Sequence, residues 1–191
     1  MSHEIAKASD AVAGGLVAGT RHTETAMAMG RFRMECYDKD GVLKWSAEEK
    51  NLVVNVGLQY MAGVALTSTT QILTTSWYIG LYGAGASNTP AATDTLATHA
   101  GWTEVNPYSG NRPAVTFVAA TNANPSVVTN SASPAAFSIN ATQVVGGAFL
   151  CSAASGTSGT LFSAADFQSP GDRSVVSGDT LNVTYTFSLA G

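Results

Sequence analysis

The amino-acid sequence predicts an all-β protein: an antiparallel β-sandwich or jelly roll with an extended N-terminal arm and at most one short helix. Several short segments alternate apolar and polar residues with a period of two. Turns rich in Gly, Pro and Asn separate these segments. At 191 residues the chain is long enough for one well-buried domain, with residues left over for an arm. We therefore assign residues 1–28 to the arm and residues 29–191 to the sandwich domain.

The arm differs from the rest of the chain in its pattern. Its centre, AVAGGLVAG, has neither helical nor strand periodicity, and its glycines make ordering costly. We expect it to become ordered only when it lies against another surface, such as that of a neighbouring subunit. A tail without a role is the alternative. Its apolar points of attachment would be Ile5, Val12, Leu16 and Val17.

A leading hairpin is predicted over residues 29–50. Phe32, Met34 and Cys36 alternate with charged residues, and the turn DKDG leads into VLKWSA, with Leu43 and Trp45 on one face. Residues 51–66 predict a short helix that begins at Asn51 or Asn55. One side of this helix would carry Val54, Leu58 and Met61.

The remaining residues predict strands joined by turns. The predicted strands are SWYIGLYG, RPAVTFVAA, AAFSIN, TQVVGGAFLCSA, GTLFSA and TLNVTYTFSL. The last has the clearest alternation, because five apolar side chains fall on one face and polar ones on the other. The apolar ones are Leu181, Val183, Tyr185, Phe187 and Leu189.

The composition argues against several classes of partner. Charged residues make up 12% of the chain, about half the usual share, so part of the surface is expected to be covered by a partner. A net charge of −4 offers no field for nucleic acid, and no apolar run is long enough to span a membrane. No export signal is seen at the N-terminus, so we expect synthesis in the cytoplasm. Cys36 and Cys151 are expected to be buried free thiols.

No catalytic or cofactor motif stands out. The three histidines are isolated, no CxxC or HxxxH occurs, and no glycine-rich segment has the context of a phosphate loop. A Ser–His–Asp arrangement built on His99 and Asp94, or a glycosidase pair built on Glu104, has little support. The sequence therefore predicts a protein that is not an enzyme and that holds no metal or cofactor.

Residues 94–117, DTLATHAGWTEVNPYSGNRPAVTF, collect the polar and aromatic groups that a site would need. Asp94 fits a turn or a helix N-cap, and Arg112 is expected to pair with Glu104, with Asp94 or with backbone carbonyls. Trp102 and Tyr108 suit a core edge or an interface. Structural organisation of this connection is the main interpretation. Contact with a partner through Trp77, Trp102, Tyr108 or Arg112 is the second, and catalysis is the third.

Several ordered motifs carry a resemblance to a known family. WYIGLYG, DTLATHAGWTE, YSGNRPAVTF, AAFSIN, GGAFL, GTLFSA and SGDTLNVTYTF, with the upstream CYDKDGVLKW, resemble virion proteins of tailed bacteriophages. The resemblance covers roughly residues 30–190. Within that group the chain is most similar to capsid decoration, or cement, proteins.

This resemblance implies a non-enzymatic role on the capsid exterior. The implied partners are the major capsid protein and other copies of the chain in a homo-oligomer, and the implied mechanism is repeated burial of surface across capsomer junctions. The alternative is a tail-fibre or receptor-binding module whose exposed aromatic residues stack on sugar rings. The resemblance carries over no catalytic residue.

Overall fold

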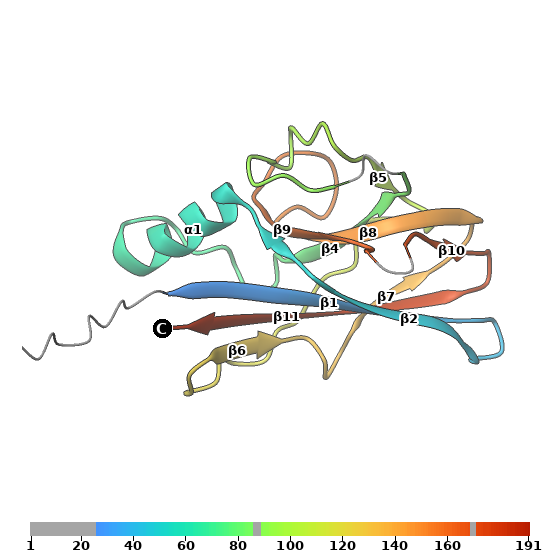
Figure 1. Cartoon of the computed structure of the whole chain (residues 1–191), viewed down its shortest axis with the longest axis horizontal. Coiled ribbons are helices and arrows are strands. Elements are labelled where there is room, and N and C mark those ends of the chain that lie inside the picture. Colours follow the sequence, from blue (N-terminus) through green and yellow to red (C-terminus); the bar gives the residue numbers. More distant parts are fainter. Residues whose placement is uncertain (1–25, 86–88, 169–170) are drawn as a thin grey trace, which may run out of the picture.

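In the computed structural model, residues 26–85, 89–168 and 171–191 are described. They form two antiparallel sheets and a single helix, as Figure 1 shows. The first sheet contains β1 (Met27–Tyr37), β2 (Leu43–Lys50), β6 (Ser126–Thr129), β7 (Ala135–Ser138) and β11 (Thr180–Ala190). The second contains β3 (Leu52–Val53), β4 (Tyr78–Gly83), β5 (Glu104–Val105), β8 (Gln143–Cys151), β9 (Leu161–Asp166) and β10 (Arg173–Val175). The helix is α1 (Asn55–Leu66).

The predicted leading hairpin is confirmed as β1 and β2. Asp38 closes its turn, because its Oδ1 accepts hydrogen bonds from the backbone N–H groups of Asp40 at 2.9 Å and Val42 at 2.8 Å. Gly41 in this turn has a φ of +79°, which glycine adopts without strain. Phe32 and its inward neighbours on β1 are buried, and Arg31 points outward to Glu48 on β2. The alternation along β1 therefore separates core from solvent as predicted.

The first sheet is ordered β2–β1–β11–β6, with β7 also paired to β11. The final strand, β11, pairs along its whole length with β1, the first strand of the domain. The first and last strands of the described domain are therefore neighbours in one sheet. Leu181, Val183 and Tyr185 are almost fully buried, whereas Leu189 at the end of β11 is 45% exposed. The predicted inward face of β11 is therefore confirmed over most of the strand, and its side chains become exposed only toward the C-terminal end.

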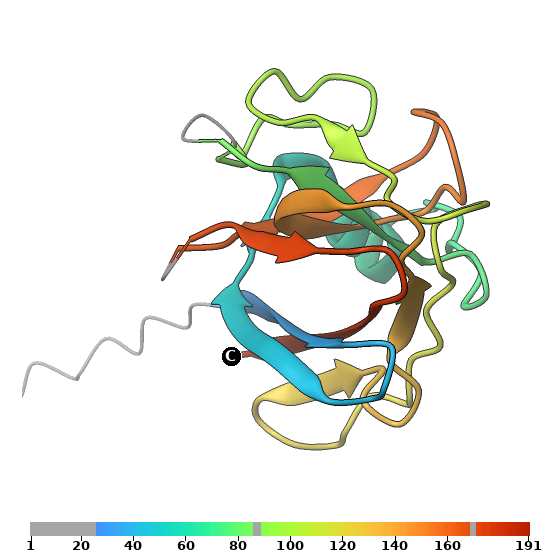
Figure 2. The same cartoon turned by 90° about the vertical axis from the view of Figure 1, so that its right-hand side faces the viewer.

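The second sheet, ordered β3–β9–β8–β4–β5, is covered on both faces. One face packs on the first sheet and forms the main core. The connection between β4 and β5 lies over the other face (Figure 2). Trp102 in this connection joins a second apolar cluster with Phe149 and Tyr82. Strands covered on both faces carry continuous apolar runs rather than alternation, as in GGAFLC of β8.

The predicted helix is confirmed from Asn55, but its orientation differs from the prediction. Val54 is fully buried, while Leu58 is 43% exposed. The buried helical residue is Gly57, where a Cβ would come within 2.3 Å of the carbonyl oxygen of Phe162. This glycine lets the helix backbone approach β9 closely. The side of the helix that faces β9 is therefore the side that carries Gly57.

One predicted strand is wrong. RPAVTFVAA forms only an isolated bridge, between Ala114 and Tyr78. The backbone hydrogen bonds of this segment go to both sheets. The N–H of Val115 donates to the carbonyl of Trp77, beside the second sheet, and the N–H of Val118 donates to the carbonyl of Thr129 on β6 of the first sheet. A segment that crosses from one sheet to the other builds no continuous ladder with either. The predictions also missed β3, β5, β6 and β10, which have two to four residues each.

Candidate functional site

The polar and aromatic residues of the stretch from 94 to 117 lie in the connection that covers the outer face of the second sheet. Asp94 is buried, and its Oδ2 accepts hydrogen bonds from the backbone N–H of Ala91 and from Nε1 of Trp102, both at 2.9 Å. The indole ring lies 5.2 Å from the ring of Tyr82 and 5.0 Å from that of Phe149, measured between centroids. Asp94 therefore closes a turn, as predicted, and also fixes Trp102 on the sheet.

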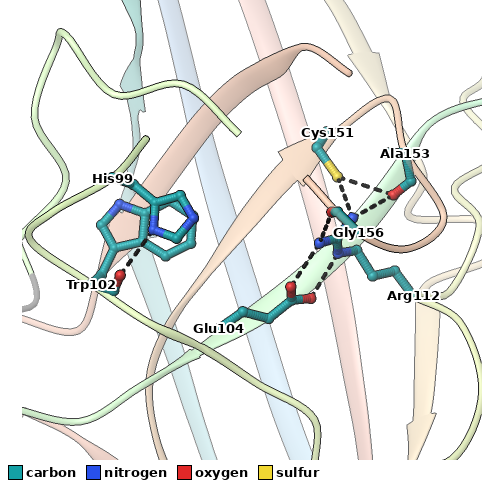
Figure 3. A network of polar contacts seen from close by, with 7 residues as sticks. All are labelled: His99, Trp102, Glu104, Arg112, Cys151, Ala153 and Gly156. Carbon is teal, nitrogen blue, oxygen red and sulfur yellow. Dashed lines mark hydrogen bonds and ion pairs between the residues drawn. The ribbon is translucent and has the colours of Figure 1, made fainter. Parts of the chain in front are cut away.

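His99 stacks on Trp102, with ring centroids 3.8 Å apart and planes inclined by 13° (Figure 3). Its Nδ1 lies 2.9 Å from the carbonyl oxygen of Trp102, which can only accept, so Nδ1 carries the proton. Within the described residues no hydrogen bond joins His99 to a serine or a carboxylate. Oδ2 of Asp94 accepts its hydrogen bonds from Trp102 and from the backbone of Ala91. This arrangement lacks the relay that activates a nucleophilic serine.

Arg112 is the centre of a second network, drawn in Figure 3, and its guanidinium is almost fully enclosed. Nε and Nη2 form a fork to the two carboxylate oxygens of Glu104, each at 2.7 Å. Nη1 donates to the carbonyl of Ala153 at 2.7 Å, and Nη2 also donates to that of Gly156 at 2.8 Å. Nη1 further lies 3.7 Å from Sγ of Cys151. These five contacts match the five N–H donors of a guanidinium, so none remains for an anionic ligand.

The network of Arg112 links three parts of the chain. It joins the edge strand β5, the segment leading to β6 and the connection after β8, and the guanidinium lies 5.2 Å from the centroid of the Phe149 ring. Burial, the largest single cause, lowers the pKa of Arg112, but the hydrogen bonds to Glu104 and the electrostatic effects of Cys151, Glu104 and Tyr108 together outweigh it, so the net pKa is raised. The predicted pairing with Glu104 and backbone carbonyls is confirmed. Its effect is to hold the loops in one arrangement.

The two cysteines are free and buried, as predicted. Burial raises the pKa of Cys151 despite the lowering effects of the Ala153 carbonyl and of Arg112. Burial, followed by the charge of Asp179, raises the pKa of Cys36 to about 12. Both side chains are therefore thiols at neutral pH, and a thiol is a poor nucleophile.

The residues proposed to contact a partner divide into three groups. Trp102, Tyr108 and Arg112 are 3%, 7% and 4% exposed, so the proposal that they contact a partner does not fit their burial within the chain. Trp77 is half-buried against Tyr60 and remains partly accessible. The arm residues Ile5, Val12, Leu16 and Val17 lie outside the described residues.

Asp179 and Asn130 are buried polar residues that were not identified from the sequence. Asp179 accepts hydrogen bonds from Nζ of Lys44 at 2.5 Å and from the backbone N–H of Val176 at 2.9 Å. Burial, the largest single cause, raises the pKa of Asp179, but the hydrogen bonds from Lys44, Val176 and Cys36 and the charge of Lys44 together outweigh it, so the net pKa is lowered. Asn130 is fully buried, accepts from the backbone N–H of Tyr185 at 2.6 Å and donates to the carbonyl of Val183. No local pattern marks either residue, because their partners are distant in sequence.

Across the described ranges, no three His, Cys, Asp or Glu side chains come together in a group that could hold a metal ion. In the same ranges no helix is long and apolar enough to cross a bilayer. Comparisons with family models, with curated proteins and with solved structures found no match to this chain.

Proposed function

We propose that the protein is a non-enzymatic structural component of a tailed-bacteriophage virion, a capsid decoration protein that binds outside the shell and bridges neighbouring capsomers. Its partners would be the major capsid protein and other copies of itself. The proposal rests on the resemblance of residues 30–190 to such proteins and on the distribution of apolar side chains over the surface.

The observation that carries the bridging role is that strongly exposed apolar side chains lie at both ends of the long axis. At one end, α1 and the segment after it expose Leu66 by 87% and Leu73 by 69%. At the other end, the β1–β2 turn exposes Val42 by 61%, and the start of β2 exposes Leu43 by 48% (Figure 1). A protein that joins two neighbours needs one contact surface for each, and burial of apolar surface supplies the free energy of both contacts.

The internal polar networks support a mechanical role of this kind. Arg112, Glu104 and Asp94 direct their side chains to groups of the same chain, and so fix the loops that cover the second sheet. A rigid body loses little conformational entropy when it binds, so more of the contact energy is retained. The alternative, a sugar-binding module, has less support: of the three aromatic residues considered for it, Trp102 and Tyr108 lie in the interior and Trp77 alone is partly accessible.

The test is binding of purified protein to capsids that lack it, with the copy number per particle counted by quantitative mass spectrometry. Leu66→Asp and Val42→Asp should each lower retention, because each places a charge in one of the two contact surfaces. Val118→Asp is the matched control, since Val118 is similarly apolar and 45% exposed but lies beside β6, away from the tip of each end. Hundreds of copies per particle with this pattern support the proposal. A handful of copies, or equal loss in all three variants, contradicts it.

A further inference from the structure

The helix α1 carries no charged residue and buries little of its surface. Figure 1 shows it at one end of the molecule. No Lys, Arg, Asp, Glu or His occurs from residue 51 to residue 93, a range that contains the whole helix. The buried residue of the helix is Gly57, on the side that faces β9. A surface helix normally carries charged residues on its outer face, so α1 has the composition of a helix that is covered by another surface.

A row of apolar residues runs along the outer face of α1. Leu58, Ala62 and Leu66 follow one another at intervals of four residues, and all three are exposed, Leu58 by 43% and Leu66 by 87%. Residues four apart lie on one side of a helix and form a ridge along which two helices can pack. Asn55 and Gln59, which border the row, are polar but uncharged. The row thus offers two large apolar side chains with a small one between them.

This row is symmetric about its centre, because Leu58 and Leu66 each lie four residues from Ala62. A two-fold contact requires a surface that fits an identical copy of itself. When two copies of α1 run in opposite directions and cross at Ala62, Leu58 of each copy lies opposite Leu66 of the other. The small side chain of Ala62 lets the two backbones approach closely at the crossing point. No like charges meet in such a pair, because the helix has no charged residue.

The ends of α1 also favour an antiparallel copy as the partner. A helix carries a partial positive charge at its N-terminus and a partial negative charge at its C-terminus. The first turn of α1 has no acidic residue, the last turn has no basic residue, and the N-cap residue makes no side-chain hydrogen bond to the helix. Side chains of the helix therefore do not balance its dipole. In an antiparallel pair the dipoles of the two helices are opposed, so each copy compensates the other.

We propose that α1 is a contact between two copies of this chain, in which the rows formed by Leu58, Ala62 and Leu66 pack in opposite directions about a two-fold axis at Ala62. This inference deepens the proposed function, because it names the surface through which copies contact each other, and it rests on the part of that function in which copies are partners.

The size of the contact determines its strength. A helix of 12 residues is about 18 Å long, and at a width of roughly 10 Å the contact covers about 180 Å² of each copy. A stable interface buries about 800 Å² of each partner. The pair is therefore weak in dilute solution, and it forms when copies are concentrated or are held side by side on a common surface.

The test is disulfide trapping in concentrated purified protein. Leu58→Cys and Leu66→Cys chains are mixed in equal amounts under mild oxidation, and one of them carries a short mass tag, so that mixed and like dimers are distinguished. In the proposed pair position 58 faces position 66, whereas two copies of position 58 lie about 12 Å apart along the helices, beyond the roughly 4.4–6.8 Å between Cα atoms that a disulfide spans. The two native cysteines are buried, so the introduced thiols are the accessible ones.

Random collision would make mixed dimers half of the product. Mixed dimers should instead exceed the like dimers together by roughly fivefold, because the geometry of a disulfide is met only between positions 58 and 66. Ser131→Cys is the control for collision, since Ser131 is exposed and follows β6 of the first sheet. Mixed dimers at half of the product, or trapping no faster than in the Ser131→Cys chain, would overturn the proposal.

Ala62→Glu then distinguishes a second copy from the capsid protein as the partner of α1. This change places two like charges together at the two-fold axis, while Glu is a good helix former, so the circular dichroism spectrum should be unchanged and the excess of mixed dimers lost. An excess that persists in this background contradicts the crossing at Ala62. No excess in the original mixture, together with weaker capsid retention of Ala62→Glu, would overturn the inference and leave the proposed function standing. An excess of mixed dimers without binding to capsids would support the inference and contradict the virion role.

Discussion

Removal of the Glu104 carboxylate tests whether the Arg112 network stabilises the fold. Glu104→Ala leaves an enclosed guanidinium without its counter-charge, while its bonds to Ala153 and Gly156 remain. Breaking a buried ion pair by removing one partner costs about 3–5 kcal/mol. The Glu104 side chain is 23% exposed, so water can reach part of the site. We therefore expect the lower end, about 3 kcal/mol.

The assay is urea unfolding followed by tryptophan fluorescence, with thermal melting as a second measure. A loss of about 3 kcal/mol corresponds to roughly 6–12 °C in Tm for a domain of this size. Glu48→Ala is the matched control. The distance from its carboxylate to Arg31 is similar, 2.8 Å, but the side chains of Arg31 and Glu48 are 57% and 48% exposed, so a loss of only about 0–1 kcal/mol is expected.

A double variant separates the charge from the packing. Arg112→Met added to Glu104→Ala removes the unpaired charge, so the double variant should be more stable than the sum of the two single losses indicates. If Glu104→Ala loses no more stability than Glu48→Ala, water solvates Arg112 in place of the carboxylate. The conclusion that the network holds the loops would then be refuted.

Three further predictions concern the core, the response to acid and the arm. Val183→Asp should abolish soluble folding while Thr184→Asp is tolerated, because only the first buries a charge; the reverse result in an expression and solubility assay would shift the register of β11 by one residue. The pKa of Asp179 is lower in the folded chain than in the unfolded chain, so its contribution is present at neutral pH and lost as the pH falls through the acid range. The urea midpoint of Asp179→Asn between pH 7 and pH 3 should therefore fall less steeply than that of the unaltered chain, and parallel curves would argue against this role. Deletion of residues 1–25 should leave the sandwich folded by circular dichroism but reduce its retention on capsid particles, whereas equal retention would exclude a binding role for the arm.

The elements predicted correctly from the sequence are those whose signal is local. The β1–β2 hairpin needs only alternation and a turn in which Asp38 bonds to its own neighbours. The strand β11 could be predicted from its alternation of apolar and polar residues alone. The helix α1 begins at Asn55, one of the two predicted starts. Pairing of Arg112 with Glu104 was also predicted, because both charges lie in one short segment with few competitors.

The failures have one physical origin, which is a contact made with a distant segment. Trp102 and Tyr108 were expected at a core edge or an interface; both are buried, Trp102 over Phe149 and Tyr108 edge-on against Phe137, and their partners could not be predicted. The short strands β5, β6 and β10 carry too few residues for a period to show. They exist because a longer strand already offers free backbone groups to each of them.

The sequence by itself determined which strands have an inward face, where the leading hairpin turns, and that charged residues are scarce in this chain. Only the tertiary structure decided that the second sheet is covered on both faces and that Asp179 bonds to Lys44, 135 residues away. It also decided that the outer face of α1 stays exposed. Periodicity records how a side chain is oriented relative to its own backbone. Which distant segment meets that side chain depends on how the two sheets and their connections pack, and no local pattern encodes this.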